Sequence, residues 1–138
     1  MNSSWYADEI TAGHNGTIQN PYLVHDEESL AALANQTNRN TSQNGFSNKY
    51  ILLIADLDLN GDTYQWPRIG NKTAFKFKGS FNGGGHTITN MNITYASTPE
   101  YYRLGLFGYA EGATIRDVHL TDVVVGINVR VRSSVPAD

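Results

Sequence analysis

The chain has 138 residues, which is enough for a single domain with a buried core, and its composition gives no sign of a second domain. Ten Lys and Arg residues against thirteen Asp and Glu residues give a formal net charge of −3, which is too small and too mixed to indicate nucleic acid or an anionic membrane as a partner. The absence of cysteine excludes disulfides and thiolate metal sites, and no apolar run approaches the roughly 20 residues of a membrane span, so we expect no membrane insertion.

We interpret residues 1–20 as an N-terminal arm. The start of the chain lacks the basic segment and the apolar segment of a secretion signal. The abundance of Asn, Thr, Ser, Gly and Tyr favours strands and turns over helices. Asn-x-Ser/Thr triplets are open to glycosylation in an extracellular eukaryotic or archaeal setting, although a chain this rich in Asn and Thr also makes them by chance. They begin at Asn2, Asn15, Asn35, Asn40, Asn71 and Asn92.

Residues 27–36 have the pattern of a short helix. Asp26 is placed to cap the N-terminus, and Leu30, Leu33 and Ala34 fall on one face. A helix of about ten residues is marginal on its own, so this one must dock on an apolar surface.

Residues 50–60 give the strongest strand signal, because one face is apolar at every second position. The other face changes from apolar Leu52 and Ile54 to polar residues, so we expect something to cover its first half, and the helix at 27–36 is the nearest candidate. A shorter strand is predicted at 22–24, and the polar run 36–47 predicts an exposed loop.

The segment 85–94 recurs as 112–121 with Gly, Thr and Ile in matching places, a period of 27 residues that is typical of stacked units. Ile88 and Met91 are three positions apart, so a bend must separate them, and Asn90 and its counterpart Asp117 tolerate the left-handed backbone that a bend needs. Stacking would place Ile88 over Ile115 about 4.8 Å away, with Asn90 near Asp117. This favours a β-solenoid over the hairpins of a β-sandwich.

A further series of short motifs resembles the GLUG-motif surface proteins of bacteria and archaea over roughly residues 20–125. The motifs are the strand 22–24, the helix with Leu30 to Ala34, and the segments 54–59, 66–70, 77–83, 85–88 and 104–108. The resemblance implies the N-terminal cap and early coils of a right-handed parallel β-helix in a cell-surface scaffold or adhesin, and it carries over no catalytic residue.

The expected architecture is therefore all-β: a short right-handed parallel β-helix, or solenoid, with an N-terminal capping α-helix in a single domain, 1–138. After the arm come the cap helix and first strands at 21–60, coils at 61–132 and a tail at 133–138. The apolar run at 123–131 would leave an open sheet edge. We expect a C-terminal continuation, or another copy in an oligomer or filament, to pair with it.

Two groups of residues are candidates for binding. Asp56, Asp58, Asn60 and Asp62 match the first half of a calcium loop, but Pro67 stands where such a loop needs a bidentate Glu, and a solvated strand face explains the same pattern. Aromatic residues beside polar ones in loops suit glycan or protein recognition, although they also suit packing against the strands; these are Tyr64, Trp66, Tyr95, Tyr101 and Tyr102.

The function expected from these features is that of a noncatalytic extracellular scaffold or adhesion module at the cell surface. Its loops would bind a host or cell-surface glycan or protein, with calcium as the one cofactor under consideration. Two alternatives stay open: a self-assembling structural subunit of a filament or surface layer, and the N-terminal part of a β-helix enzyme that acts on polysaccharides.

Overall fold

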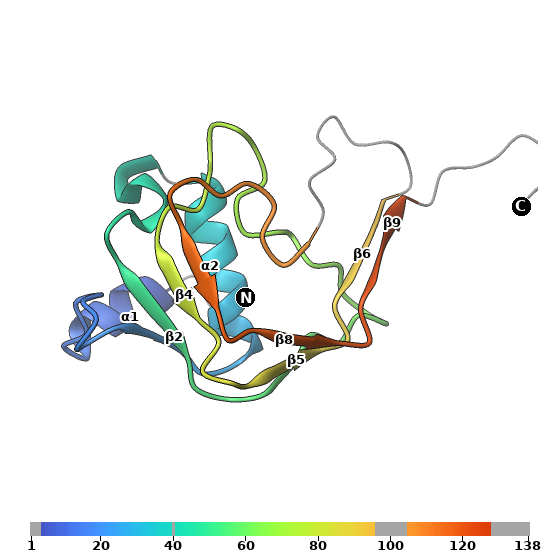
Figure 1. The fold of residues 1–138 in the computed structure, drawn as a ribbon, viewed down its shortest axis with the longest axis horizontal. Helices are drawn as coiled ribbons and strands as arrows, with labels where there is room; N and C mark the ends of the chain where they lie inside the picture. Colours follow the sequence, from blue (N-terminus) through green and yellow to red (C-terminus); the bar gives the residue numbers. More distant parts are fainter. Residues whose placement is uncertain (1–3, 40, 96–104, 128–138) are drawn as a thin grey trace, which may run out of the picture.

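The computed structural model describes residues 4–39, 41–95 and 105–127 (Figure 1). Tyr101, Tyr102 and the end of the expected last coil lie outside these residues. The described helices are α1 (Trp5–Thr11), α2 (Glu27–Arg39) and the 3-10 helix η1 (Thr41–Phe46). The described strands are β1 (Tyr22–Val24), β2 (Tyr50–Leu53), β3 (Leu57–Asp58), β4 (Ser80–Asn82), β5 (Thr87–Thr89), β6 (Asn92–Tyr95), β7 (Thr114–Arg116), β8 (His119–Thr121) and β9 (Val124–Ile127). None of the described helices is long and apolar enough to cross a membrane.

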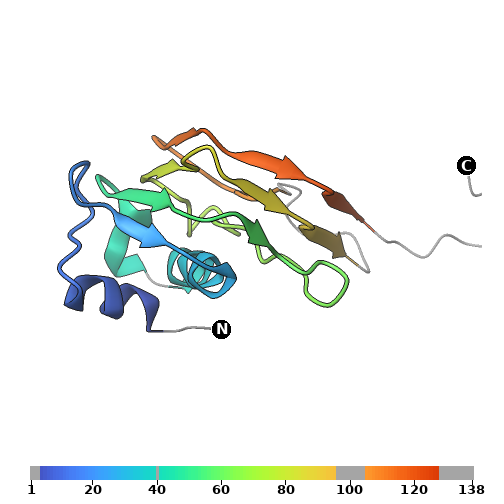
Figure 2. The same ribbon diagram turned by 90° about the horizontal axis from the view of Figure 1, so that it is seen from below.

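The strands form three small parallel sheets, in the orders β1-β2-β4-β7, β3-β5-β8 and β6-β9. Successive layers of the chain therefore lie on one another, as Figure 2 shows. Side chains that point inward form columns across the layers: Ile51 pairs with Phe81, and Phe81 with Ile115. A second column joins Leu57, Ile88 and Leu120.

The expected all-β parallel β-helix is wrong. Helix accounts for 22% of the chain and strand for 30%, and the separate sheets do not close into a solenoid. In Figure 1 the sheets follow three sides of a U, with β5 and β8 at its base. On the remaining side, the described segments 66–78 and 105–111 pair in parallel through isolated bridges between Ile69 and Phe107 and between Phe77 and Ala110. Pro67 and the left-handed backbone of Arg68 (φ 59°) interrupt any regular strand there.

The predicted bends are confirmed, but the predicted stacking is not. Asn90 and Asp117 have φ values of 67° and 56°, in the left-handed region that Asn and Asp tolerate. However, Ile88 lies beside Leu120 rather than Ile115. The two copies of the repeat form successive corners of the U, β5 to β6 and β7 to β8, so the sequence period of 27 residues is not the spacing between layers.

Helix α2 covers the inner face of the first strands, not the outer face that the sequence led us to expect. Leu30 and Leu33 are buried in the same core as Ile51 and Leu53. Ile54, on the opposite face, is 42% exposed. The helix packs on the inner face because that face gives its narrow apolar stripe an apolar surface to bury against.

Helix α2 also continues through part of the run that was expected to be an exposed loop. The Asn38 side chain accepts hydrogen bonds from the backbone N–H groups of Gly70 and Asn71 at 2.8 and 2.9 Å, and it donates to the Arg68 carbonyl at 2.7 Å. Phe46, at the end of η1, is completely buried. The last turn of α2 thus holds the irregular side of the U in place.

Helix α1, which the sequence did not predict, closes the outer edge of β1. Glu9 Oε1 accepts the Leu23 N–H at 2.6 Å, and Trp5 Nε1 donates to the Leu23 carbonyl at 2.8 Å. Figure 2 shows α1 beyond β1, at the first end of the stack. Both polar groups that Leu23 presents at the sheet edge are therefore satisfied by side chains rather than by another strand.

Candidate functional site

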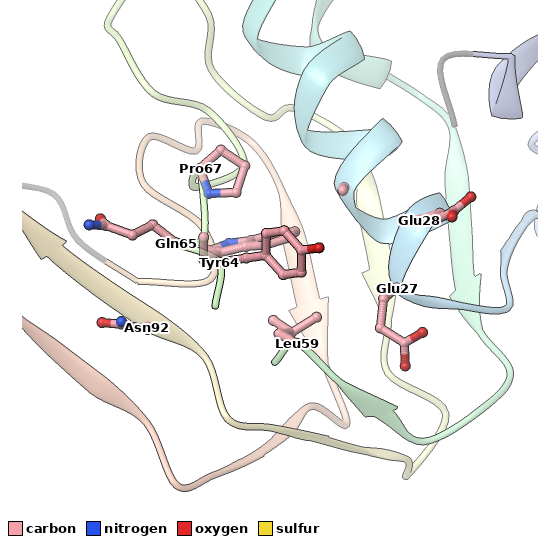
Figure 3. A pocket seen from close by; sticks show the side chains of 9 residues that line it. Glu27, Glu28, Leu59, Tyr64, Gln65, Pro67 and Asn92 are labelled. Carbon is pink, nitrogen blue, oxygen red and sulfur yellow. The ribbon is translucent and has the colours of Figure 1, made fainter. Parts of the chain in front are cut away.

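A pocket of about 430 Å³ lies between the first turns of α2 and the segment 59–67 (Figure 3). We call it the α2 pocket. Its lining combines aromatic, aliphatic, acidic and amide side chains: Glu27, Glu28, Ala31, Leu59, Tyr64, Gln65, Trp66, Pro67 and Asn92. These residues come from α2, from the chain after β3 and from β6.

Short-range hydrogen bonds shape the segment that carries the two aromatic rings. Asn60 has a left-handed backbone (φ 53°), and its N–H donates to Asp58 Oδ1 at 2.8 Å. The Asn60 carbonyl accepts the N–H groups of Thr63 and Tyr64, both at 3.0 Å, which makes a tight turn. The turn brings the Tyr64 side chain to the surface, where it is 64% exposed.

Trp66 is fixed from both its backbone and its ring. Its backbone N–H donates to the Asn92 carbonyl at 2.7 Å, and its indole Nε1 donates to the Leu106 carbonyl at 2.9 Å. The side chain is only 6% exposed, so Trp66 belongs to the core and contributes to the pocket as part of a rigid wall. Tyr64, by contrast, stands free at the rim.

Two carboxylates give the α2 pocket an acidic side. Glu27 and Glu28 lie in the first turn of α2, where the partial positive charge of the helix end favours them. Glu27 Oε2 also accepts the Asp58 N–H at 3.2 Å, which ties the helix to the end of β3. The pocket therefore offers hydrogen-bond acceptors and negative charge beside an apolar wall. Such a lining favours ligands with hydroxyl or cationic groups over anionic ones.

The structure brings Tyr64 and Trp66 together, as two members of the predicted aromatic group. Tyr95 lies in β6, where its backbone pairs with Ile127. Sequence reasoning missed the acidic side, because Glu27 and Glu28 predicted only the start of a helix. It also missed Leu59 and Asn92, whose pattern indicated strands alone.

The first two residues of the predicted calcium loop, Asp56 and Asp58, have carboxylates that are bonded within the chain. Asp56 Oδ1 accepts the Thr87 N–H at 2.9 Å and lies 3.1 Å from His86 Nδ1. The hydrogen bond from Thr87, followed by the one from His86, holds the pKa of Asp56 below its ordinary value. Asp58 Oδ1 binds the Asn60 N–H, as described above. Within the described ranges, no three His, Asp or Glu side chains gather closely enough to hold a metal, and Asp62 is an exposed turn residue.

Comparison with known proteins gives two similar segments. The chain is 30% identical over 125 residues to Halomucin of Haloquadratum walsbyi, which covers 82% of this chain and 1% of Halomucin. It is 35% identical over 117 residues to a Gly-rich membrane protein of Evansella cellulosilytica, which covers 81% of this chain and 12% of that protein. The chain thus spans only a small part of either relative. No family model and no solved structure matches it, so the GLUG resemblance finds support only in the hint of a surface protein. Together the two similarities point to a surface-associated protein.

Proposed function

We propose that this chain is a noncatalytic, extracellular binding module of a surface-associated protein, and that the α2 pocket holds a segment of a neutral glycan. The observation that carries the proposal is the exposed Tyr64 ring at the rim of a pocket with a fixed Trp66 wall. Figure 3 shows Tyr64 between Pro67 and Leu59, with Glu27 and Glu28 to one side.

The chemistry of the lining suits a sugar. A sugar ring has an apolar face that packs on an aromatic side chain, and it has hydroxyl groups that donate to carboxylate and amide oxygens. Tyr64 offers the first contact, and Glu27, Glu28 and Gln65 offer acceptors. The volume of about 430 Å³ falls in the range of small-ligand pockets, roughly 300–1,000 Å³. The two carboxylates would disfavour the binding of uronic or sialic acid units, because like charges repel.

The arrangement of the acids favours binding over cleavage. Glu27 and Glu28 are consecutive on a helix, so their side chains point in different directions instead of facing each other across a substrate. Hydrolysis of a glycosidic bond needs two carboxyl groups on opposite sides of that bond. The alternative of a polysaccharide-active enzyme is tested by incubating the protein with any glycan that it binds and looking for shorter products.

The test is a glycan array with neutral and acidic oligosaccharides, followed by titration calorimetry with the best neutral binder. Tyr64→Ala removes one stacked ring, a loss of about 0.5–1.5 kcal/mol, which corresponds to roughly two- to twelvefold weaker binding. Tyr50→Ala is the matched control, because Tyr50 is also exposed (37%) but does not line the α2 pocket. Failure to bind any neutral glycan, or equal weakening by both variants, would overturn the proposal.

A further inference from the structure

The two ends of the stacked sheets are built differently. At the first end, Glu9 and Trp5 satisfy the backbone of Leu23, as shown above. At the other end lie the outer edges of β7, β8 and β9, which we call the open edge. In the described part of the chain, no strand follows β7, β8 or β9 in the sheet orders. One end of the stack is therefore capped and the other is not.

The core is also uncovered at the open edge. Phe81 and Ile88 in the preceding layer are 1% and 0% exposed, whereas their column neighbours Ile115 and Leu120 are 41% and 40% exposed. Two further apolar residues of this last layer, Val123 and Val124, are 37% and 58% exposed. Apolar side chains in the position of core residues have thus been left in contact with water, which marks an interaction surface.

The pairing pattern shows which backbone groups the open edge presents. Thr114 donates to Gly79 and the Arg116 carbonyl accepts from Gly83, so both face the preceding layer. In a strand the polar groups alternate between the two edges, and Ile115 therefore presents its N–H and C=O outward. The same argument applies to Leu120, since the Thr121 carbonyl accepts from Asn90. It also applies to Val125, since Val124 donates to Met91.

We propose that the open edge binds the open edge of a second copy of this chain, around a two-fold axis that passes through Leu120. Figure 1 shows the last layer as a U, with β8 as its base and β7 (orange) and β9 (red) as its arms. A two-fold axis along the bisector of the U lays β8 on the partner's β8 and β7 on the partner's β9. Every strand then gains an antiparallel neighbour.

The positions of the outward backbone groups fit this axis. An antiparallel arrangement centred on Leu120 sets Leu120 opposite itself and Ile115 opposite Val125 of the second copy. All of these residues present their N–H and C=O outward, so each opposed pair can exchange two hydrogen bonds. The exposed side chains of Ile115 and Leu120 would meet their counterparts, and the two cores would become continuous.

The charges of the last layer are compatible with the same axis. It sets Arg116 opposite Val124, Asp117 opposite Val123, and Asp122 opposite Val118. No two like charges of the described residues face each other directly. A register shifted by one residue would instead set Asp117 opposite Asp122, which like charges across a ladder disfavour.

The capped first end limits assembly to a dimer. Head-to-tail growth would need the outer edge of β1, where the side chains of Glu9 and Trp5 occupy the Leu23 backbone. A pairing of open edge with open edge uses the same surface on both copies and leaves nothing for a third. Assembly through this edge alone therefore gives a closed pair and not a filament.

The first test is the mass in solution, measured by analytical ultracentrifugation over a wide range of concentration. We expect a species of twice the 15.2 kDa of one chain. Two variants of opposite charge at Val124 separate an effect on the dimer from an effect on folding. Val124 is 58% exposed and would face Arg116 of the second copy. The two-fold axis makes this contact twice, so Val124→Lys should raise the dissociation constant about two- to thirtyfold, and Val124→Glu should leave it unchanged or lower it.

A cross-link provides the second test, because the chain contains no cysteine. Leu120→Cys would place two thiols across the axis on opposed residues about 5.5 Å apart at Cα, within the range for a disulfide. Mild oxidation should convert this variant to a covalent dimer. Ile10→Cys, at a site in α1 that is 51% exposed and lies at the first end of the stack, should stay mostly uncrosslinked.

Three outcomes would overturn the proposal. A monomer at all concentrations would mean that another polypeptide covers the open edge. Growth beyond the dimer with concentration would contradict the closed pair. Equal cross-linking of Leu120→Cys and Ile10→Cys would show that the thiols meet by random collision and not in a defined dimer. None of these results depends on glycan binding, because Tyr64 and the α2 pocket lie outside the open edge.

Discussion

Replacement of Glu9 by Ala should destabilise the protein through the edge of β1. Glu9 is only 6% exposed, and its carboxylate accepts the Leu23 N–H at 2.6 Å. Its same oxygen lies 2.7 Å from His14 Nδ1. Alanine removes the acceptor, so the partly buried Leu23 N–H loses its partner. A buried donor left unsatisfied costs about 1–3 kcal/mol.

The expected change in melting temperature follows from the size of the chain. Unfolding entropy of roughly 2.1 cal/mol/K per residue gives about 0.3 kcal/mol/K for 138 residues. A loss of about 1–3 kcal/mol then lowers Tm by about 3–10 °C. Glu9→Gln keeps an oxygen that can accept the same hydrogen bond, so its cost should stay under about 1 kcal/mol.

Two measurements check this reasoning at fixed protein concentration. Thermal unfolding followed by circular dichroism gives the change in Tm for both variants, and amide hydrogen exchange reports the Leu23 N–H directly. We expect faster exchange at Leu23 in Glu9→Ala and near-normal exchange in Glu9→Gln. If Glu9→Ala lies within about 0.5 kcal/mol of the parent chain, water replaces the carboxylate and the capped edge is not a source of stability.

Two further predictions concern the helix start and the turn after α2. Burial by itself raises the pKa of Asp26, but hydrogen bonds from Ser29 outweigh it and hold the pKa below its ordinary value of 3.8. The charged Asp26 therefore stabilises the folded chain fully well above pH 3.8, and this stabilisation is lost as the pH falls from 3.8 through the lowered pKa. Asp26→Asn keeps the helix cap but has no charge to lose, so its stability should fall less at acid pH than that of the parent chain. Asp26→Ala removes the cap and should cost about 1 kcal/mol at neutral pH. If the parent chain and Asp26→Asn lose the same stability at acid pH, the role given to the Asp26 charge is wrong. Gly45→Ala should cost more than about 2 kcal/mol in urea unfolding, because φ is +63° and the new Cβ would lie 2.1 Å from the Lys76 carbonyl oxygen. Gly85→Ala, with φ +77° and nothing within 4 Å, should cost about 1 kcal/mol, and equal losses at the two glycines would contradict the steric argument.

Local signals predicted those elements whose conformation depends on their own residues. The strand at 22–24 and the start of the strand at 50–60 are confirmed because alternating burial leaves a period of two in the sequence. The helix was found from its cap and its apolar stripe. Asn90 and Asp117 were placed at bends because few other residues accept a left-handed backbone.

The elements that sequence reasoning missed depend on partners that are distant along the chain. Helix α1 is only seven residues long, and it is held by the bonds of Trp5 and Glu9 to Leu23. Phe46 stands in a polar run, yet it packs against Trp5 at a centroid distance of 6.3 Å. In the same way, the acidic side of the α2 pocket exists only because α2 docks beside Trp66.

The error in the stacking register has a physical origin. A sequence repeat reports that two segments share a local shape, here a strand, a left-handed bend and a strand. It does not report which backbone groups pair, and that choice is made by the hydrogen bonds between layers. Ile88 and Ile115 are equivalent in shape but lie on different sides of the U.

The same hydrogen-bond reasoning unites the two ends of the stack. A parallel stack leaves unpaired N–H and C=O groups at its first and last layers, and each layer must find partners for them. The first layer finds them in Glu9 and Trp5, which explains why so short a segment before β1 holds a helix. Among the described residues, the last layer has no such helix, and its inward side chains Ile115 and Leu120 are partly exposed as well. At the open edge, outward backbone groups and exposed apolar side chains thus lie side by side, and the proposed antiparallel second copy would provide partners for both.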